Sequence, residues 1–203
     1  MRKDSLAFAL SGVVFGLLMG WMIGTQHAPQ PAAPAAAPVA QAAPGQQPAA
    51  APPPLDQARV SALEQQAKAE PGNAAVRIAL GNLYFDSEQF ADAAPWYEAA
   101  LEIDPRNVDA TTDLGIVYFY QRQFDRALAT FDRALAVDPG HVKALLNQGI
   151  VRSMGKQDFA GAAESWERVV TLAPDSEEAR LARMGLEGIR SSQAPGQGAA
   201  AVQ

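Results

Sequence analysis

The sequence predicts an all-α fold, an α-solenoid of stacked antiparallel helix hairpins. The first observation is a repeat, because one set of residues returns after 34 positions within residues 74–174. The recurring set is Leu80, Gly81, Tyr84, Ala93, Tyr97, Ala100 and Pro105, then Leu114, Gly115, Tyr118, Ala127, Phe131, Ala134 and Pro139. The second observation is that apolar residues within each copy recur with helical spacing. A hairpin of this length cannot bury its own apolar face, so about three must stack to make a stable body.

Each copy divides into two helices. An Asp-Pro pair ends the second helix of the first two copies, because the residue before a proline is pushed out of the α region. Recurring glycines and alanines let helix axes approach closely, while aromatic residues fill the remaining gaps. The predicted core contains Gly81, Gly115, Gly149, Tyr84, Tyr97, Tyr118 and Phe131. Pro95 falls inside the second helix of the first copy, where we expect it within about the first two turns, with a slight bend.

The third copy follows the pattern more loosely. It keeps Gly149, Ala162, Trp166 and Pro174, but one residue is inserted in its middle. Polar residues, Gln148 and Arg152, stand where leucine and tyrosine are expected. We therefore expect its packing to depart most from that of the other copies.

The same rhythm extends beyond the three copies and defines the domain boundaries. We expect a repeat domain at 55–190 and a disordered tail at 191–203. Within the domain, the predicted parts are a half-repeat helix at 55–70, repeats at 74–107, 108–141 and 142–176, and a capping helix at 176–190. Such end helices cover the apolar faces of the outermost hairpins.

The sequence predicts a transmembrane anchor at the N-terminal residues 1–25. Residues 6–23 are uncharged and apolar, and as a helix they would span roughly 27 Å, close to the thickness of a bilayer core. A cleaved signal peptide is the alternative, but its apolar core is usually shorter and no convincing cleavage site follows here. Arg2 and Lys3 precede the run, so the positive-inside rule predicts a cytoplasmic N-terminus. The repeats would then lie outside the inner membrane, in the periplasm of a bacterium with two membranes.

Glycines recur at every fourth position of this segment: Gly12, Gly16, Gly20 and Gly24. They share one helix face, and small residues there let a second membrane helix approach closely. The series predicts a helix-packing face, for a homodimer or another membrane protein. The plainer interpretation is that glycine is common in membrane helices.

The sequence predicts a disordered linker at residues 26–54, because this stretch has nine prolines among alanines and glutamines. Proline at this density removes amide donors and prevents helix and sheet from propagating. We expect the linker to hold the repeats away from the bilayer.

The recurring Leu-Gly-x-x-Tyr, Ala-aromatic-Ala and Pro pattern resembles that of the tetratricopeptide repeat (TPR) family, although the family's tryptophan near the start of the first helix is absent. The resemblance implies a superhelix whose first helices line a concave, peptide-binding side. The inward positions are Asn82, Phe85, Asp86, Asp109, Thr112, Asp113, Ile116, Phe119, Tyr120, Lys143, Asn147, Ile150 and Met154. Asparagines could bond a peptide backbone and the aromatic residues could anchor it. Alternatively, Phe85 and Phe119 only pack between hairpins and the carboxylates are solvated.

One binding mode of the family clamps a C-terminal carboxylate with lysines, asparagines and an arginine. Asn82 and Lys143 match that pattern, whereas Ile78, Asp113 and Asn147 depart from it. Because Asp113 would repel a carboxylate, we predict that this clamp does not operate. Acidic groups on this side favour a segment that carries Lys or Arg, or a neutral apolar one.

Composition argues against other functions. The chain carries a formal net charge of −6 and shows no basic stripe, which makes nucleic acid a poor partner. With no cysteine and only two histidines, His27 and His141, no metal cluster or histidine-based triad can be assembled. We therefore expect neither an enzyme nor a cofactor.

The sequence favours a membrane-anchored adaptor that binds a protein or peptide partner, in the assembly of an envelope complex. The alternative is a self-associating structural organiser that uses the glycine face and the repeat body.

Overall fold

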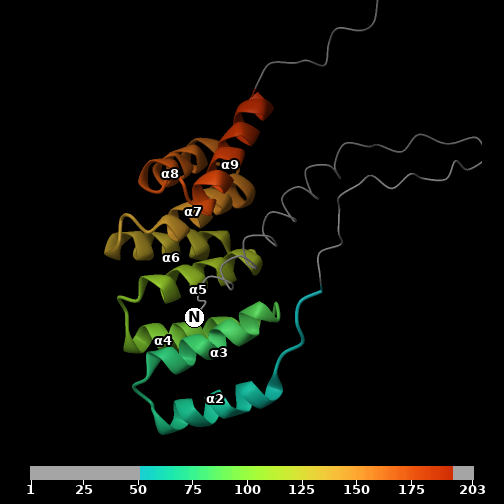
Figure 1. Ribbon diagram of the computed structural model, residues 1–203, viewed down its shortest axis with the longest axis vertical. Helices are drawn as coiled ribbons and strands as arrows, with labels where there is room; N and C mark the ends of the chain where they lie inside the picture. The colour runs from blue at the N-terminus through green and yellow to red at the C-terminus, as the bar shows by residue number, and fades with distance from the viewer. Residues whose placement is uncertain (1–50, 194–203) are drawn as a thin grey trace, which may run out of the picture. The chain divides into compact units, whose positions relative to one another are not determined.

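The computed structural model describes residues 51–193, and all of them except Ala51 belong to one compact unit, Pro52–Gln203. This part contains eight α-helices and one π-helical turn, stacked in chain order from α2 to α9 (Figure 1). The elements are α2 (Gln57–Ala69), α3 (Ala74–Asp86), α4 (Phe90–Ile103), α5 (Val108–Tyr120), α6 (Phe124–Val137), α7 (Val142–Ile150), η1 (Val151–Gly155), α8 (Phe159–Leu172) and α9 (Glu177–Gln193). The predicted all-α fold is confirmed for these residues.

The predictions for the termini concern other residues. The anchor at 1–25 with its glycine face, most of the linker and residues 194–203 lie outside the described part of the chain. Within residues 51–193, no helix is long and apolar enough to cross a membrane.

Helices pack as three hairpins with a single helix at each end. The most extensive contacts join α3 to α4 and α5 to α6, and α8 packs on both α7 and α9. Helix α9 ends at Gln193, three residues beyond the predicted boundary, so residues 191–193 are helical rather than part of a disordered tail. Two hydroxyls extend it, because Ser191 and Ser192 donate to the carbonyls of Gly188 and Ile189 in the last turn.

A glycine of each first helix packs under an aromatic ring of the second helix. A Cβ atom on Gly115 would lie 2.6 Å from the Phe131 ring, and one on Gly81 would lie 2.9 Å from the Tyr97 ring. Both rings are buried, with exposed fractions of 0% for Phe131 and 1% for Tyr97. Helix axes therefore approach closely where the sequence predicts it. Tyr84 differs from the other predicted core aromatics, because it is only partly buried, against a small cluster with α2.

Helix starts and ends also repeat. The side chains of Asn73, Asn107 and His141 cap α3, α5 and α7 by accepting a backbone N–H of the first turn. At the opposite end, a residue with positive φ turns the chain into the second helix: Glu88 (56°), Arg122 (60°) and Gln157 (55°). Around Glu88 the amides of residues 88 and 89 return to carbonyls of the last helical turn, a typical C-terminal cap.

The inserted residue of the third copy is absorbed by η1. The positive-φ residues lie 34 positions apart between the first two copies and 35 apart between the second and third. The extra residue therefore lies before Gln157, within the first helix, where a π-helical turn takes in one more residue than an α-turn. The hydrogen bond that crosses the turn lengthens to match: Asp158 N–H donates to Arg152 C=O, while Gln123 N–H donates to Tyr118 C=O.

Both ends of the stack carry polar side chains at positions that are apolar inside it. In α2, Arg59 and Gln66 are exposed one repeat before the buried Ala93 and Ala100. In α9, Arg183 is exposed at the position that the buried Leu114 occupies in α5. Pro95 lies in the second turn of α4, as predicted, with its ring toward solvent. The end helices therefore close the stack on both sides.

Candidate protein-binding surface

Helices α3, α5 and α7 lie next to one another and form the first-helix face. Side chains join them, since Phe85 of α3 contacts Tyr120 of α5, and Asp113 of α5 contacts Lys143 of α7. The predicted binding residues on this face differ in accessibility. Asn82, Asp86, Asp109 and Met154 are exposed, and Asp113, Phe119, Tyr120, Lys143 and Asn147 are half-buried. Phe85, Thr112, Ile116 and Ile150 are buried, so in this structure they support the face from below rather than offering contact area.

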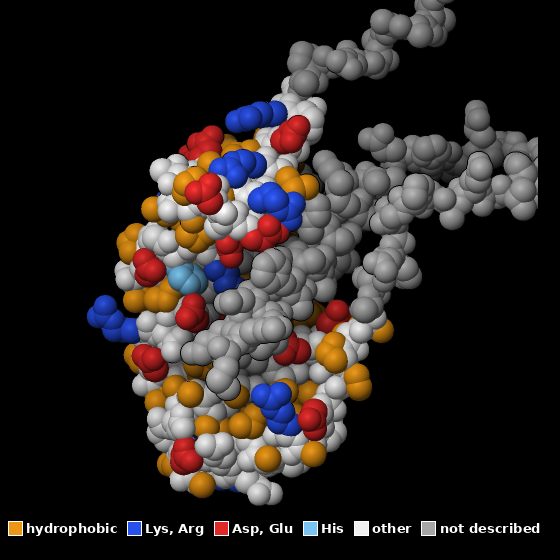
Figure 2. Space-filling model, viewed as in Figure 1, with side chains coloured by type: hydrophobic (Ala, Val, Ile, Leu, Met, Phe, Trp, Pro, Cys, Tyr) orange, Lys and Arg blue, Asp and Glu red, His pale blue; other side chains and the backbone are white. Residues whose placement is uncertain are grey.

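One ion pair and one histidine–carboxylate hydrogen bond occupy the α5–α7 side of the face. Lys143 Nζ donates to Asp113 Oδ1 at 2.6 Å. The His141 Nδ1 atom accepts the backbone N–H of Ala144, which leaves the proton on Nε2, 3.1 Å from Asp109 Oδ1. Figure 2 shows a histidine side chain in pale blue at the surface, with acidic side chains nearby. Because Asp113 already holds Lys143, the one lysine that matches the carboxylate clamp is neutralised.

Asp86 of α3 and Asp113 of α5 lie on neighbouring first helices and are called the acidic pair below; the Tyr97 hydroxyl also reaches α3. That hydroxyl donates to Asn82 Oδ1 at 2.6 Å. Burial raises the pKa of Tyr97, and the charges of Asp113 and Asp86 raise it further. Burial also raises the pKa of Asp86, against the opposing charge of Arg59. Within residues 51–193, no ion pair involves Asp86.

An aromatic cluster of five rings adjoins this pair, where the first helices turn into the second. Its members are Phe85, Phe90, Phe119, Tyr120 and Phe124. Phe90 and Tyr120 stack with ring centroids 4.4 Å apart, and Phe85 meets both rings edge-on. Four of the five remain half-buried, which leaves ring edges available to a partner.

Phe90 and Phe124 were not among the predicted binding residues. They occupy the first position of α4 and α6, and they lie 34 residues apart. The repeat period therefore carried the signal that a recurring aromatic residue begins each second helix.

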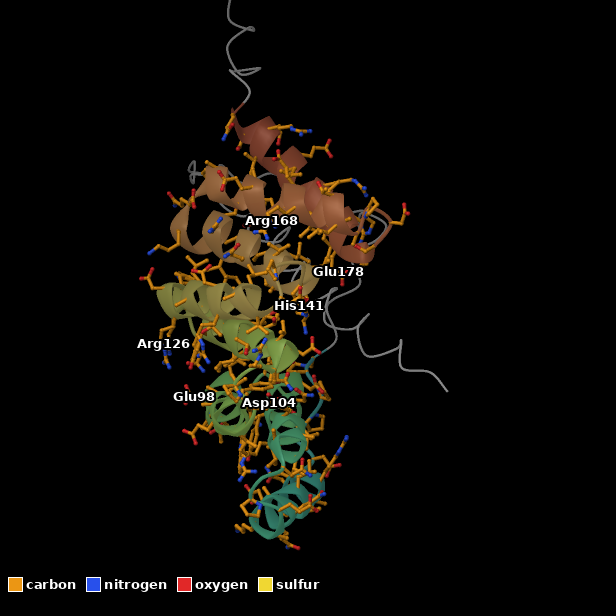
Figure 3. All side chains as sticks on the ribbon, turned by 90° about the vertical axis from the view of Figure 1, so that its left-hand side faces the viewer. Glu98, Asp104, Arg126, His141, Arg168 and Glu178 are labelled. Carbon is orange, nitrogen blue, oxygen red and sulfur yellow. The ribbon has the colours of Figure 1, made fainter. Side chains whose placement is uncertain are left out.

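A different contact joins the first two hairpins on the α4–α6 side. Tyr118 donates a short hydrogen bond to Glu98, and Arg126 Nη2 donates to the Tyr118 hydroxyl at 2.7 Å. The Arg126 guanidinium also lies 4.0 Å from the centre of the Tyr118 ring. Figure 3 labels Glu98 and Arg126 close together at the side of the stack. This bridge ties neighbouring repeats and takes no part in the first-helix face.

The polar substitutions of the third copy form a cavity of about 370 Å³ between α6 and α8. Gln148 Nε2 donates to Asp132 Oδ1 at 2.7 Å, and Ser165 Oγ donates to Gln148 Oε1 at 3.0 Å. Arg152 donates to Gly161 C=O at 2.9 Å. No buried side-chain N or O atom in the described residues lacks a partner, so this network replaces the apolar packing of the other copies without needing a ligand. Those residues also contain no group of three His, Asp or Glu side chains placed to hold a metal ion.

Helical hairpins stacked with a 34-residue period define the repeat class of α-solenoids. Models described as "Tetratricopeptide repeat" match residues 56–108, 84–149 and 143–176. The chain belongs to the tetratricopeptide repeat family, whose members are generally non-catalytic scaffolds for protein interaction.

Solved structures agree with that assignment. MamA is 22% identical over 64% of this chain and 77% of its own, with a TM-score of 0.57. The first TPR domain of Spaghetti (RPAP3), bound to the HSP90 peptide SRMEEVD, is 26% identical over 58% and 93%, with a TM-score of 0.53. YrrB, described as a TPR protein with an unusual peptide-binding site, is 24% identical over 63% and 64%, with a TM-score of 0.57. A search of curated protein sequences found no match.

Proposed function

We propose that this protein is a membrane-tethered adaptor that binds a segment of a protein partner on its first-helix face. The observation that carries the proposal is the half-exposed aromatic cluster beside the acidic pair Asp86 and Asp113. Half-buried aromatic rings are typical anchors of interfaces, because they bury large area with little loss of side-chain freedom. The charged groups beside them would select and orient the bound segment.

Relatives support a peptide as the bound species. The RPAP3 domain was solved with a peptide, and YrrB is described by its peptide-binding site. By analogy, we infer that the inner side of this stack receives an extended segment rather than a folded domain.

The predicted anchor and linker would set where the repeat domain lies in the cell. A single membrane helix followed by a proline-rich spacer would hold the repeats on the extracytoplasmic side of the inner membrane, where they could recruit components of an envelope complex. The competing proposal is a self-associating organiser. The polar ends of the stack argue against end-to-end growth of the repeat body, which leaves the glycine face as its main support.

Site-specific photo-crosslinking in native membranes tests the proposal. A photo-reactive amino acid at Tyr120 should trap a distinct partner, whereas the same group at the exposed Arg133 on α6 should not. A cross-link only to a second copy of the chain would support the organiser instead. Equal trapping at both positions, or trapping at neither, would refute binding on the first-helix face.

A further inference from the structure

We infer that the bound segment carries a lysine or arginine and, three positions before or after it, an aromatic or large aliphatic residue. This inference rests on the proposed function and adds the chemistry of the partner. It follows from the distance between Asp113 and Tyr120 along α5 and from the charges on the first-helix face.

The spacing comes from α5, which carries both features. Asp113 and Tyr120 are seven residues apart, nearly two full turns, so their side chains leave the helix on the same face. At 1.5 Å per residue, the two positions are roughly 10.5 Å apart along the helix. An extended peptide rises about 3.3 Å per residue, so three residues cover that distance.

The sign of the charge comes from the acidic pair. Asp86 and Asp113 lie on the neighbouring first helices α3 and α5, and the Tyr97 hydroxyl donates to Asn82 and so adds no positive charge. Asp86 takes part in no ion pair among the described residues, and its exposed carboxylate is open to a cation of the bound segment. An acidic segment would meet the repulsion of Asp86 at the same place, because no ion pair among the described residues involves that carboxylate.

Lys143 makes the inference specific, because it competes with the bound segment for the carboxylate of Asp113. Its Nζ lies 2.6 Å from Asp113 Oδ1, with the lysine side chain 40% and the aspartate side chain 22% exposed. An incoming ligand cation must share Asp113 with Lys143 or displace it. Removing the Lys143 charge should therefore strengthen the binding of a basic segment, whereas a purely structural ion pair predicts no such gain.

The aromatic side of the site is preformed. Phe90 and Tyr120 stack nearly parallel, with 4° between their planes, and Phe119 packs edge-on against Tyr120. The rings already lie against each other, so a ligand side chain placed on them would order few additional groups. The same rings would also accept the stem or charge of an arginine through a cation–π contact.

Fluorescence anisotropy with the purified full-length chain in mild detergent tests the inference. The probe is a labelled octapeptide in which a lysine and a phenylalanine are separated by two serines, with glycine and serine at its ends. The first comparison replaces its lysine by glutamate, and the second places lysine and phenylalanine next to each other. The peptide SRMEEVD, which the RPAP3 domain binds, serves as an acidic comparison.

We expect the lysine probe to bind about tenfold more tightly than the glutamate version, and about threefold more tightly than the version without the spacer. SRMEEVD should bind no better than the glutamate version. Asp86→Asn and Asp113→Asn should each weaken the lysine probe, and Lys143→Met should strengthen it. Glu102→Gln is the matched control, because Glu102 is exposed in the last turn of α4, at the end of that helix away from Phe90.

Equal binding of the lysine and glutamate probes, no binding of either, or weaker binding by Lys143→Met would each overturn the inference. Those results leave the proposed function standing if photo-crosslinking at Tyr120 still traps a partner. If the cross-link also fails, both are wrong.

Discussion

The contact between Gly115 and Phe131 makes the close approach of α5 and α6 measurable. A methyl group on Gly115 would lie 2.6 Å from Cε1 of Phe131 and 2.9 Å from two further ring atoms. Phe131 is fully buried, so the ring has no free space into which to move. Gly115→Ala should therefore introduce overpacking that costs about 1–3 kcal/mol of the free energy of unfolding.

Glycine-to-alanine changes in a helix also stabilise it, by about 0.5–1 kcal/mol, and a control must remove that contribution. Gly188 in α9 serves this purpose, because a Cβ atom there would meet no atom within 4 Å. Gly188→Ala should stabilise the protein by that amount. The difference between the two variants isolates the overlap, and urea denaturation followed by circular dichroism measures it.

A double variant tests the cause. Phe131→Leu alone should destabilise through the cavity it leaves, yet in the Gly115→Ala background it should cost less, because the smaller side chain makes room for the methyl group. If Gly115→Ala and Gly188→Ala change stability equally, or if the two changes at positions 115 and 131 are simply additive, the close-packing argument is wrong.

Two other properties of the repeats are open to measurement. Burial raises the pKa of Tyr118 and of Tyr120 to about 12 each, above the value of about 10 in an unfolded chain, so the stability they confer is complete below pH 10 and lost as the pH rises toward 12. Urea midpoints measured from pH 8 to pH 12 should fall across that window while tyrosinate absorbance rises, and a midpoint that stays constant would contradict the assignment. Glu88 has φ 56°, a conformation that glycine adopts without cost, so Glu88→Gly should stabilise by up to about 1 kcal/mol. Ser87→Gly, next to it at φ −91°, should destabilise instead, and the reverse order of the two variants in a thermal melt would exclude a conformational cause.

Much of the fold was predictable because its determinants are local and repeat. Gly115 and Phe131 belong to one copy, and the equivalent residues lie 34 positions away in another copy. Two copies therefore indicate the same packing. The half-repeat helices at both ends followed from the same period. Helix α9 extends beyond its predicted end. Two serine hydroxyls donate to carbonyls of its last turn, and these serines are not part of the repeat pattern.

The binding surface was harder to predict, because its properties depend on contacts between copies. The sequence places Asp113 and Lys143 on facing helices, but only the structure shows that they pair and so neutralise the lysine. Thr112 was expected to face a ligand, yet it is fully buried beside His141. Phe90 begins a second helix, whereas the family's binding positions lie on first helices, so the repeat pattern did not predict it at this surface. Side-chain accessibility across an interface between repeats cannot be read from the pattern within one repeat.

The polar ends of the stack limit how such a protein can change its length. Arg59 and Gln66 at one end, and Arg183 at the other, would be buried if another hairpin were added beyond α2 or α9. A longer form would therefore arise more easily by duplicating an internal unit, such as residues 108–141, than by extension at either end. Duplication there would also copy Asp113 and Tyr120 together, so a lengthened descendant would acquire a second recognition unit of the same chemistry.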